Sequence, residues 1–70
     1  MNPDSIREWL QRAPFKPFLM KHSNGNTYEI RHPEMIVLGK REAVVYAPDD
    51  DSFSFVALMH VNDLQPLQKA

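Results

Sequence analysis

The sequence predicts a mainly β fold, a small antiparallel barrel of about five strands preceded by one α-helix. Two observations lead to this prediction. Short runs of alternating apolar and polar residues recur about every ten residues between residues 17 and 67, with turn-forming residues between them. The one helical pattern comes before all the strands, so no helix remains to connect parallel strands, and the strands are expected to pair antiparallel.

The size of the chain allows one domain at most, covering residues 1–70. The chain has no cysteine, so neither a disulfide nor a thiolate metal site can brace the fold. Stability must therefore come from the core or from self-association. A hydrophobic fraction of 43% is high enough for such a core and argues against disorder.

The charge of the chain is balanced overall but unevenly placed. A net charge of −1 excludes a strongly basic protein. Residues 1–47 hold seven Lys or Arg against five Asp or Glu, whereas residues 48–70 hold one Lys or Arg against four Asp or Glu. This uneven distribution allows a locally basic face. The first residues lack the pattern of a signal peptide, and no run approaches the roughly 20 apolar residues of a membrane span. We therefore expect a cytoplasmic protein with no membrane partner.

The first element is expected to be an amphipathic helix at about residues 3–12. Asn2 can cap its N-terminus, and Pro3 suits the first helical position because its missing N–H would be unpaired there anyway. Pro14 cannot continue the helix. The apolar stripe that should dock on the sheet consists of Ile6, Trp9, Leu10 and Ala13.

The strands are expected within about residues 17–67. Asn24-Gly25 predicts a tight hairpin turn, because both residues tolerate a positive φ. Pro33 cannot donate to a strand ladder, so it marks an edge, a bulge or a bend. The expected core comprises Trp9, Leu10, Phe18, Met20, Tyr28, Ile30, Ile36, Leu38, Val45, Phe55, Leu58 and Leu64.

The last long strand, Phe53 to about Val61, is apolar on both faces at its centre. A strand in a one-sided sheet would alternate. Either this strand bends and serves both halves of a barrel, or one of its faces meets another subunit. Small β domains must hide their edges, so an apolar strand near the end of the chain is a natural pairing edge. The predicted interface consists of Phe53, Phe55, Val56, Leu58 and His60.

Four segments carry a resemblance that covers most of the chain. They are Pro14-Phe15-Lys16-Pro17-Phe18, Asn24-Gly25, Tyr28 to Glu34 with its His-Pro-Glu end, and His60 to Leu67. This pattern, PFxPF then NG, HPE and HVxxLxPL, resembles that of a set of short, uncharacterised bacterial proteins. The resemblance implies a bacterial protein and brings no assigned activity with it.

The order of the expected elements is similar to that of the SH3-like and Sm-like barrels. A helix, a strand, the Asn24-Gly25 turn, a long bent strand, two strands, a one-turn helix and a short last strand follow one another in the Sm-like family. That family closes into rings through strand edges and binds RNA. It usually has a glycine in the bent strand where Ile30 stands, so Pro33 would have to make the bend here.

Side chains that could carry chemistry lack the spacing that chemistry requires. His22, His32 and His60 lie in three different segments, and no pair has a metal-binding spacing. Glu34 beside His32 has no neighbouring nucleophile or oxyanion loop. The run Asp49-Asp50-Asp51 lacks the ligand spacing of a calcium loop and suits a solvated hairpin tip. We expect no catalytic, metal or cofactor residue, no small-molecule substrate and no enzyme.

The sequence therefore favours a non-enzymatic interaction module that self-associates or docks a protein partner by β-edge pairing near Phe53–Val61. The alternative is an Sm-like RNA-binding protein. Its candidate nucleic-acid face would consist of Lys16, Lys21, Arg31, Lys40 and Arg41, with a tyrosine available to stack on bases.

Overall fold

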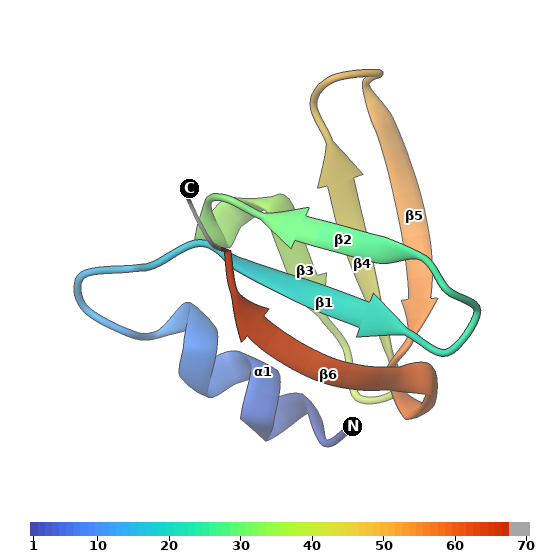
Figure 1. Cartoon of the computed structure of the whole chain (residues 1–70), viewed down its shortest axis with the longest axis horizontal. Helices are drawn as coiled ribbons and strands as arrows, with labels where there is room; N and C mark the ends of the chain where they lie inside the picture. The colour runs from blue at the N-terminus through green and yellow to red at the C-terminus, as the bar shows by residue number, and fades with distance from the viewer. Residues whose placement is uncertain (68–70) are drawn as a thin grey trace.

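Two three-stranded antiparallel sheets and one helix make up the described part of the chain (Figure 1). The first sheet has the strand order β2-β1-β6, and the second has the order β3-β4-β5. The computed structural model describes residues 1–67, with the helix α1 at Pro3–Leu10 and the strands β1 Phe18–His22, β2 Thr27–Ile30, β3 Ile36–Leu38, β4 Glu42–Ala47, β5 Ser52–Ala57 and β6 Val61–Pro66.

The helix α1 begins as the sequence predicts and ends slightly earlier. The Asn2 side chain accepts a hydrogen bond of 2.8 Å from the backbone N–H of Asp4, and Pro3 occupies the first helical position. The helix ends at Leu10 instead of about residue 12, with Gln11 as its C-cap. Residues before a proline are driven out of helical geometry, so the approach of Pro14 shortens the last turn.

Strands β1 and β2 form the hairpin that Asn24-Gly25 predicts. Gly25 has a φ of +91°, a conformation that glycine adopts without strain. The backbone N–H of His22 donates to Asn26 at 2.9 Å, and that of Gly25 donates to His22 at 3.0 Å. The pairing of Met20 with Tyr28 sets the register of this hairpin.

Pro33 divides the expected long strand into two. It begins a single 3-10 turn, η1 (Pro33–Met35), which carries the chain from β2 in the first sheet to β3 in the second. The described chain therefore has six strands instead of about five. The bend follows from the missing N–H of proline, which would leave a gap in a continuous ladder.

The expected closed barrel is not formed. Hydrogen bonds join the described strands into two separate sheets, and β5 and β6 do not pair with each other. Both passages between the sheets lie in 3-10 turns, η1 and η2 (Leu58–His60), where the backbone leaves strand geometry. The expected strand Phe53–Val61 is thus β5, one turn, and the start of β6.

The core lies between the two sheets and under the helix. Of the expected core residues, six are buried: Phe18, Met20, Ile30, Ile36, Val45 and Leu58. Trp9, Leu10, Tyr28, Leu38 and Leu64 are half-buried around them. Phe55 was wrongly placed in the core, since 75% of it is exposed. The expected core did not include Met35, Ala43, Val56 and Val61, all of which are buried, and Ile6, expected on the stripe by which the helix docks, is fully buried.

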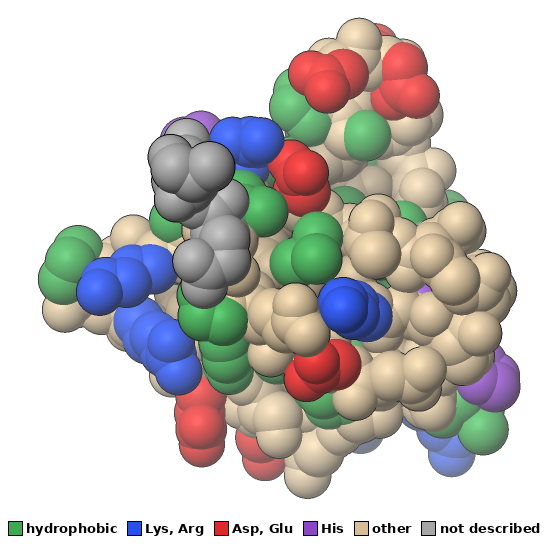
Figure 2. All heavy atoms as spheres, viewed as in Figure 1, with side chains coloured by type: hydrophobic (Ala, Val, Ile, Leu, Met, Phe, Trp, Pro, Cys, Tyr) green, Lys and Arg blue, Asp and Glu red, His purple; other side chains and the backbone are tan. Residues whose placement is uncertain are grey.

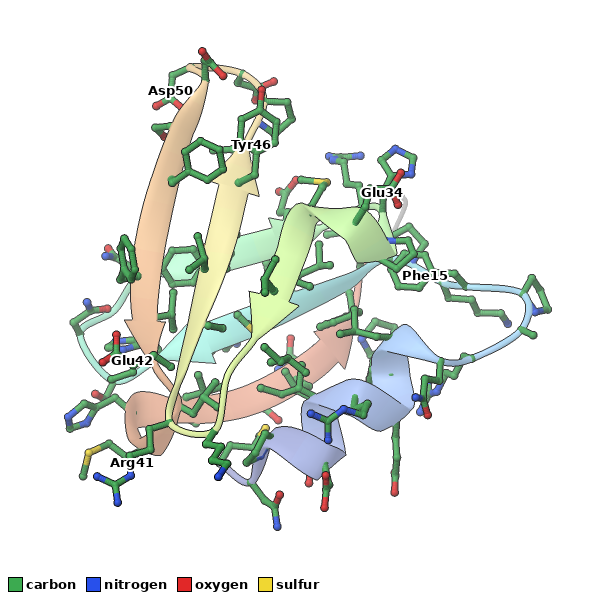
Figure 3. All side chains as sticks on the ribbon, turned by 180° about the vertical axis from the view of Figure 1, so that it is seen from behind. Phe15, Glu34, Arg41, Glu42, Tyr46 and Asp50 are labelled. Carbon is green, nitrogen blue, oxygen red and sulfur yellow. The ribbon has the colours of Figure 1, made fainter. Side chains whose placement is uncertain are left out.

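Aromatic side chains hold the helix to the first sheet. The ring centroids of Trp9 in α1 and Phe18 in β1 lie 5.3 Å apart, and the Arg12 guanidinium lies over the same indole, 4.1 Å from the ring centroid. Phe15, labelled in Figure 3, lies 6.1 Å from Phe18 by ring centroids. No helix within residues 1–67 has the length and apolar content needed to cross a bilayer.

Candidate interaction surface

The second sheet presents an apolar face to solvent. Alternation along a strand sends successive side chains to opposite faces, so each strand of this sheet has one inward and one outward set. The inward set includes Ala43, Val45 and Val56, all buried. The outward set, which we call the outer apolar face, consists of Val37, Val44, Tyr46, Phe53 and Phe55.

The outer apolar face is ordered in rows across the three strands. Val37 of β3 pairs with Val44 of β4, which pairs with Phe55 of β5. The next row pairs Tyr46 with Phe53, whose ring centroids lie 5.0 Å apart. The exposed fractions are 66% for Val37, 65% for Phe53 and 75% for Phe55. Most large apolar side chains of a small domain are hidden, so Phe53 and Phe55, which lie on the edge strand β5, are candidate contact residues.

Strand β5 is an edge of its sheet. It pairs with β4 on one side, and no other strand of the described chain pairs with it on the other. An edge strand presents unpaired backbone N–H and C=O groups that can extend the sheet with another chain. Phe53 and Phe55 thus lie beside an open ladder, where apolar contact and backbone hydrogen bonds can act together.

Opposite charges lie at the two ends of the β4–β5 hairpin. Asp49, Asp50 and Asp51 form the turn after β4, which projects away from the rest of the molecule (Figures 1 and 2). Lys40 and Arg41 precede β4 at its other end, where the exposed Glu42 begins the strand and leaves one net positive charge, and Figure 3 shows Arg41 and Asp50 at opposite ends of the hairpin. The long axis of the candidate surface therefore runs from an acidic to a basic end.

Hydrogen bonds order the acidic turn. The Tyr46 hydroxyl donates to Asp51 at 3.0 Å, and the Ser52 hydroxyl donates to Asp50 at 2.6 Å. The bond to the Asp51 carboxylate, with smaller effects of desolvation and of the nearby Asp50 charge, raises the pKa of the Tyr46 phenol above its ordinary value of 10.0. Asp51 has a φ of +52°, which aspartate tolerates better than most residues.

The predicted interface is divided between surface and core. Phe53, Phe55 and His60 are exposed. Val56 and Leu58 are 1% and 2% exposed, so both contribute to the core of their own chain. The predicted interface does not include Val37, Val44 and Tyr46, which lie on the outer apolar face with Phe53 and Phe55. Their signal was the unbroken apolar runs at 35–38 and 43–47, which, like the segment 53–61, leave apolar side chains on both faces of a strand.

The five residues of the candidate nucleic-acid face come from separate parts of the fold. Lys16 precedes β1, and Lys21 lies in β1 opposite Thr27 and Asp63. Arg31 follows β2 and forms an ion pair of 2.8 Å with Glu29. Lys40 and Arg41 belong to the turn before β4.

Two of the three histidines lie close together. The ring centroids of His22 and His60 are 5.7 Å apart, and His32 is in the segment between β2 and η1. Within residues 1–67, no group of three or more His, Cys, Asp or Glu side chains is arranged to hold a metal ion. His32 flanks Pro33 at the start of η1, where its carbonyl accepts a 3.0 Å hydrogen bond from Met35.

The hollows of the surface lie beside the candidate interaction surface. One, of about 320 Å³, separates β2 from the end of β4 and is lined by side chains that include Tyr28, Arg31 and Tyr46. Another, of about 440 Å³, lies at the basic end, among Met1, Lys40, Arg41, Leu58 and Met59. Neither brings together an acid–base pair with a nucleophile, and the residues around them do not define a reaction.

No protein-family model matches the chain, and neither searches of the curated proteins nor searches of the solved structures returned a significant match.

Proposed function

We propose that this protein is a non-enzymatic interaction module that uses the free edge of β5, together with Phe53 and Phe55, to pair with an extended segment of protein. The segment belongs to a second copy of the chain or to another protein. The observation that carries the proposal is the coincidence of an unpaired edge with two phenylalanines that are 65% and 75% exposed. Backbone hydrogen bonds would supply affinity, and the aromatic side chains would supply selectivity.

We also propose that the two sheets are the halves of an SH3-like or Sm-like fold. Strand β1 pairs with both β2 and β6, and β2 passes through a bend into β3, which begins the second sheet. A chain of this architecture leaves the edge of β5 available, which agrees with the proposed pairing. The order of elements supports this classification.

The alternative, Sm-like RNA binding, stays a prediction. The basic side chains expected to bind phosphates come from separate segments, and Arg31 is paired with Glu29. The exposed phenylalanines lie next to an acidic turn, which would repel a phosphate backbone. We therefore favour a protein partner over RNA.

The test combines the mass of the protein in solution with binding of an extended peptide. Light scattering after gel filtration measures the mass, and fluorescence anisotropy measures binding of a labelled peptide with the sequence of residues 50–59. We expect a mass above the 8.1 kDa of one chain, or saturable peptide binding. The variant Phe55→Lys should lose either property, because a charge on the exposed aromatic row opposes burial.

The matched control is Val37→Lys. Val37 is on the same outer apolar face and is 66% exposed, but it lies on β3, two strands away from the free edge. This variant should associate as the wild type does. A wild-type chain that stays monomeric and binds no peptide would contradict the proposal, and so would a Phe55→Lys variant that behaves as the wild type. Circular dichroism confirms that both variants are folded.

A further inference from the structure

The two charged ends of the β4–β5 hairpin determine which partner fits the edge. We propose that the partner is a second copy of this chain, paired antiparallel along β5 across a two-fold axis, so that the acidic turn of each copy meets the basic turn of the other. This inference rests on the proposed function, since it uses the same free edge. It adds the identity of the partner, the orientation of pairing and the register.

Alternation of side chains restricts the register. Residues directly opposite each other on antiparallel strands point to the same face. A register that keeps both faces continuous must therefore pair outward residues with outward residues. Placing Ser54 opposite its own copy achieves this, because Phe53 of each chain then lies opposite Phe55 of the other.

This register creates one aromatic row across the dimer. Within one chain, Val37, Val44 and Phe55 already form a row, and Phe53 pairs with Tyr46. Pairing Phe55 with Phe53 of the second copy joins these rows, twice by symmetry. Aromatic cross-strand pairs stabilise sheets more than most others do. A shift by two residues, with Phe55 opposite itself, would leave Phe53 opposite Ala57 and forfeit one of these contacts.

The same register brings opposite charges together. When Ser54 lies opposite itself, Ser52 lies opposite Val56 of the second copy, so the acidic turn that precedes Ser52 lies beside the turn that begins at Leu58 in that copy. Leu58 donates a backbone hydrogen bond of 2.8 Å to Arg41, so Arg41 flanks that position. Two strand spacings, about 10 Å, separate β5 of one copy from β4 of the other, which Arg41 precedes. Arg41 and Asp50 are both exposed, so their side chains are free to approach each other across this distance, and the two-fold axis repeats the approach at both ends of the interface.

A head-to-tail arrangement fits less well. The other edge strand of comparable length is β6, which carries Asp63 and Pro66 and has no aromatic residue. Pro66 has no N–H to donate to an added strand. Pairing β5 with β6 of another copy would also leave the acidic turn without the basic one opposite. A closed two-fold dimer satisfies both ends at once.

Charge reversal tests the orientation. Arg41→Glu makes both ends of the hairpin acidic, and Asp50→Lys adds a positive charge to the acidic end; both positions are exposed, so the fold should persist. Each variant alone should bind its own copy about tenfold more weakly at low salt, because two ion pairs become repulsive contacts. An equimolar mixture of the two should form heterodimers that recover most of the wild-type affinity, because complementary charges then face each other at both ends.

Disulfide trapping tests the register. The chain has no cysteine, so a single introduced thiol reports one position. Ser54→Cys should form an intermolecular disulfide under mild oxidation, since it lies opposite itself. Ser52→Cys is the matched control, because it lies opposite Val56 of the second copy and its own counterpart is four residues away along the strand. A disulfide spans Cα atoms up to about 7 Å apart, which only the first position satisfies.

The outcomes separate this inference from the proposed function. A dimer of twice 8.1 kDa, recovery on mixing and trapping at position 54 would support the two-fold pairing. A monomeric wild type overturns the two-fold pairing. Binding of the labelled peptide then tests the proposed function independently of this inference. A larger ring, or charge variants that bind as the wild type does, or equal trapping at positions 52 and 54, likewise overturns the two-fold arrangement. In those cases, loss of association in the Phe55→Lys variant would still support pairing along the edge of β5.

Discussion

At the scale of single residues, the hydrogen bond from Tyr46 to Asp51 makes the acidic turn sensitive to alkaline pH. The bond requires a protonated phenol, and it raises the pKa of Tyr46 in the folded state above the unfolded value. Its contribution to stability is therefore complete below the unfolded pKa and is lost as the pH rises through the folded pKa. We predict that Asp51→Asn lowers the pKa of Tyr46 towards 10.0.

Absorbance at the phenolate band measures this titration. The variant Tyr28→Phe removes the other tyrosine, so the signal then reports Tyr46 alone. Asp63→Asn, which neutralises an exposed carboxylate on β6 of the other sheet, is the control for a change in net charge. A Tyr46 pKa that is unchanged by Asp51→Asn would mean that the hydrogen bond does not hold the proton in solution.

Gly25 is the second residue with a specific conformational role. Its φ of +91° is unfavourable for any side chain with a Cβ, although a Cβ there would meet no atom within 4 Å. We therefore predict that Gly25→Ala destabilises the protein by about 1 kcal/mol through backbone strain alone. Chemical denaturation measures the change. Asn26→Ala, at an exposed position in the same turn, should change the unfolding free energy much less.

At the scale of elements, the helix α1 depends on the sheet that it covers. A helix of eight residues is too short to be stable alone, and its Ile6 side chain is fully buried. We predict that Ile6→Ala costs about 2–5 kcal/mol and exposes Trp9, which shifts its fluorescence to longer wavelength. Glu8→Ala, on the exposed side of the helix, is the control and should leave both properties nearly unchanged.

Local signals predicted the boundaries of elements well. Asn2-Pro3, Asn24-Gly25 and Pro33 each act through the backbone conformation of one or two residues, and each produced the cap, turn or bend that was expected. Barrel closure was not predictable in this way, because it depends on hydrogen bonds between strands far apart in the sequence. The two 3-10 turns interrupt those ladders, and only the Pro33 turn has a local signal.

The sequence predicts which strand forms the candidate surface, but it does not predict which face of that strand is exposed. The sequence predicts an interface at Phe53–Val61, but the alternation of side chains alone does not determine which face of β5 turns inward. Val56, paired with Ala43, is buried, and Ser54, paired with Val45, is half-buried on the same inward face, whereas Phe55 lies on the outward face. Because hydrophobicity favours burying phenylalanine, sequence reasoning placed Phe55 in the core as well as at the interface.

At the scale of the whole molecule, the two sheets share one core and should unfold together. Met20 of the first sheet and Val45 of the second belong to the same buried cluster. A chain of this length has a total stability of only about 4–10 kcal/mol, so neither sheet retains a sufficient core without the other. We predict that Met20→Ala costs about 2–5 kcal/mol and weakens the protection of the β4 amides from hydrogen exchange as much as that of the β1 amides.

Hydrogen exchange measured by NMR distinguishes shared from separate unfolding. The comparison must be made at one protein concentration, because association through β5 would add stability by mass action. Thr27→Ala, an exposed position in the first sheet, is the control and should leave both sets of amides protected. If Met20→Ala released the amides of β1 while those of β4 kept their protection, the sheets would be independent units. Equal loss of protection in the amides of β1 and β4 would mean that the two sheets unfold as one unit. A partner bound at the edge of β5 would then stabilise the first sheet through the shared core.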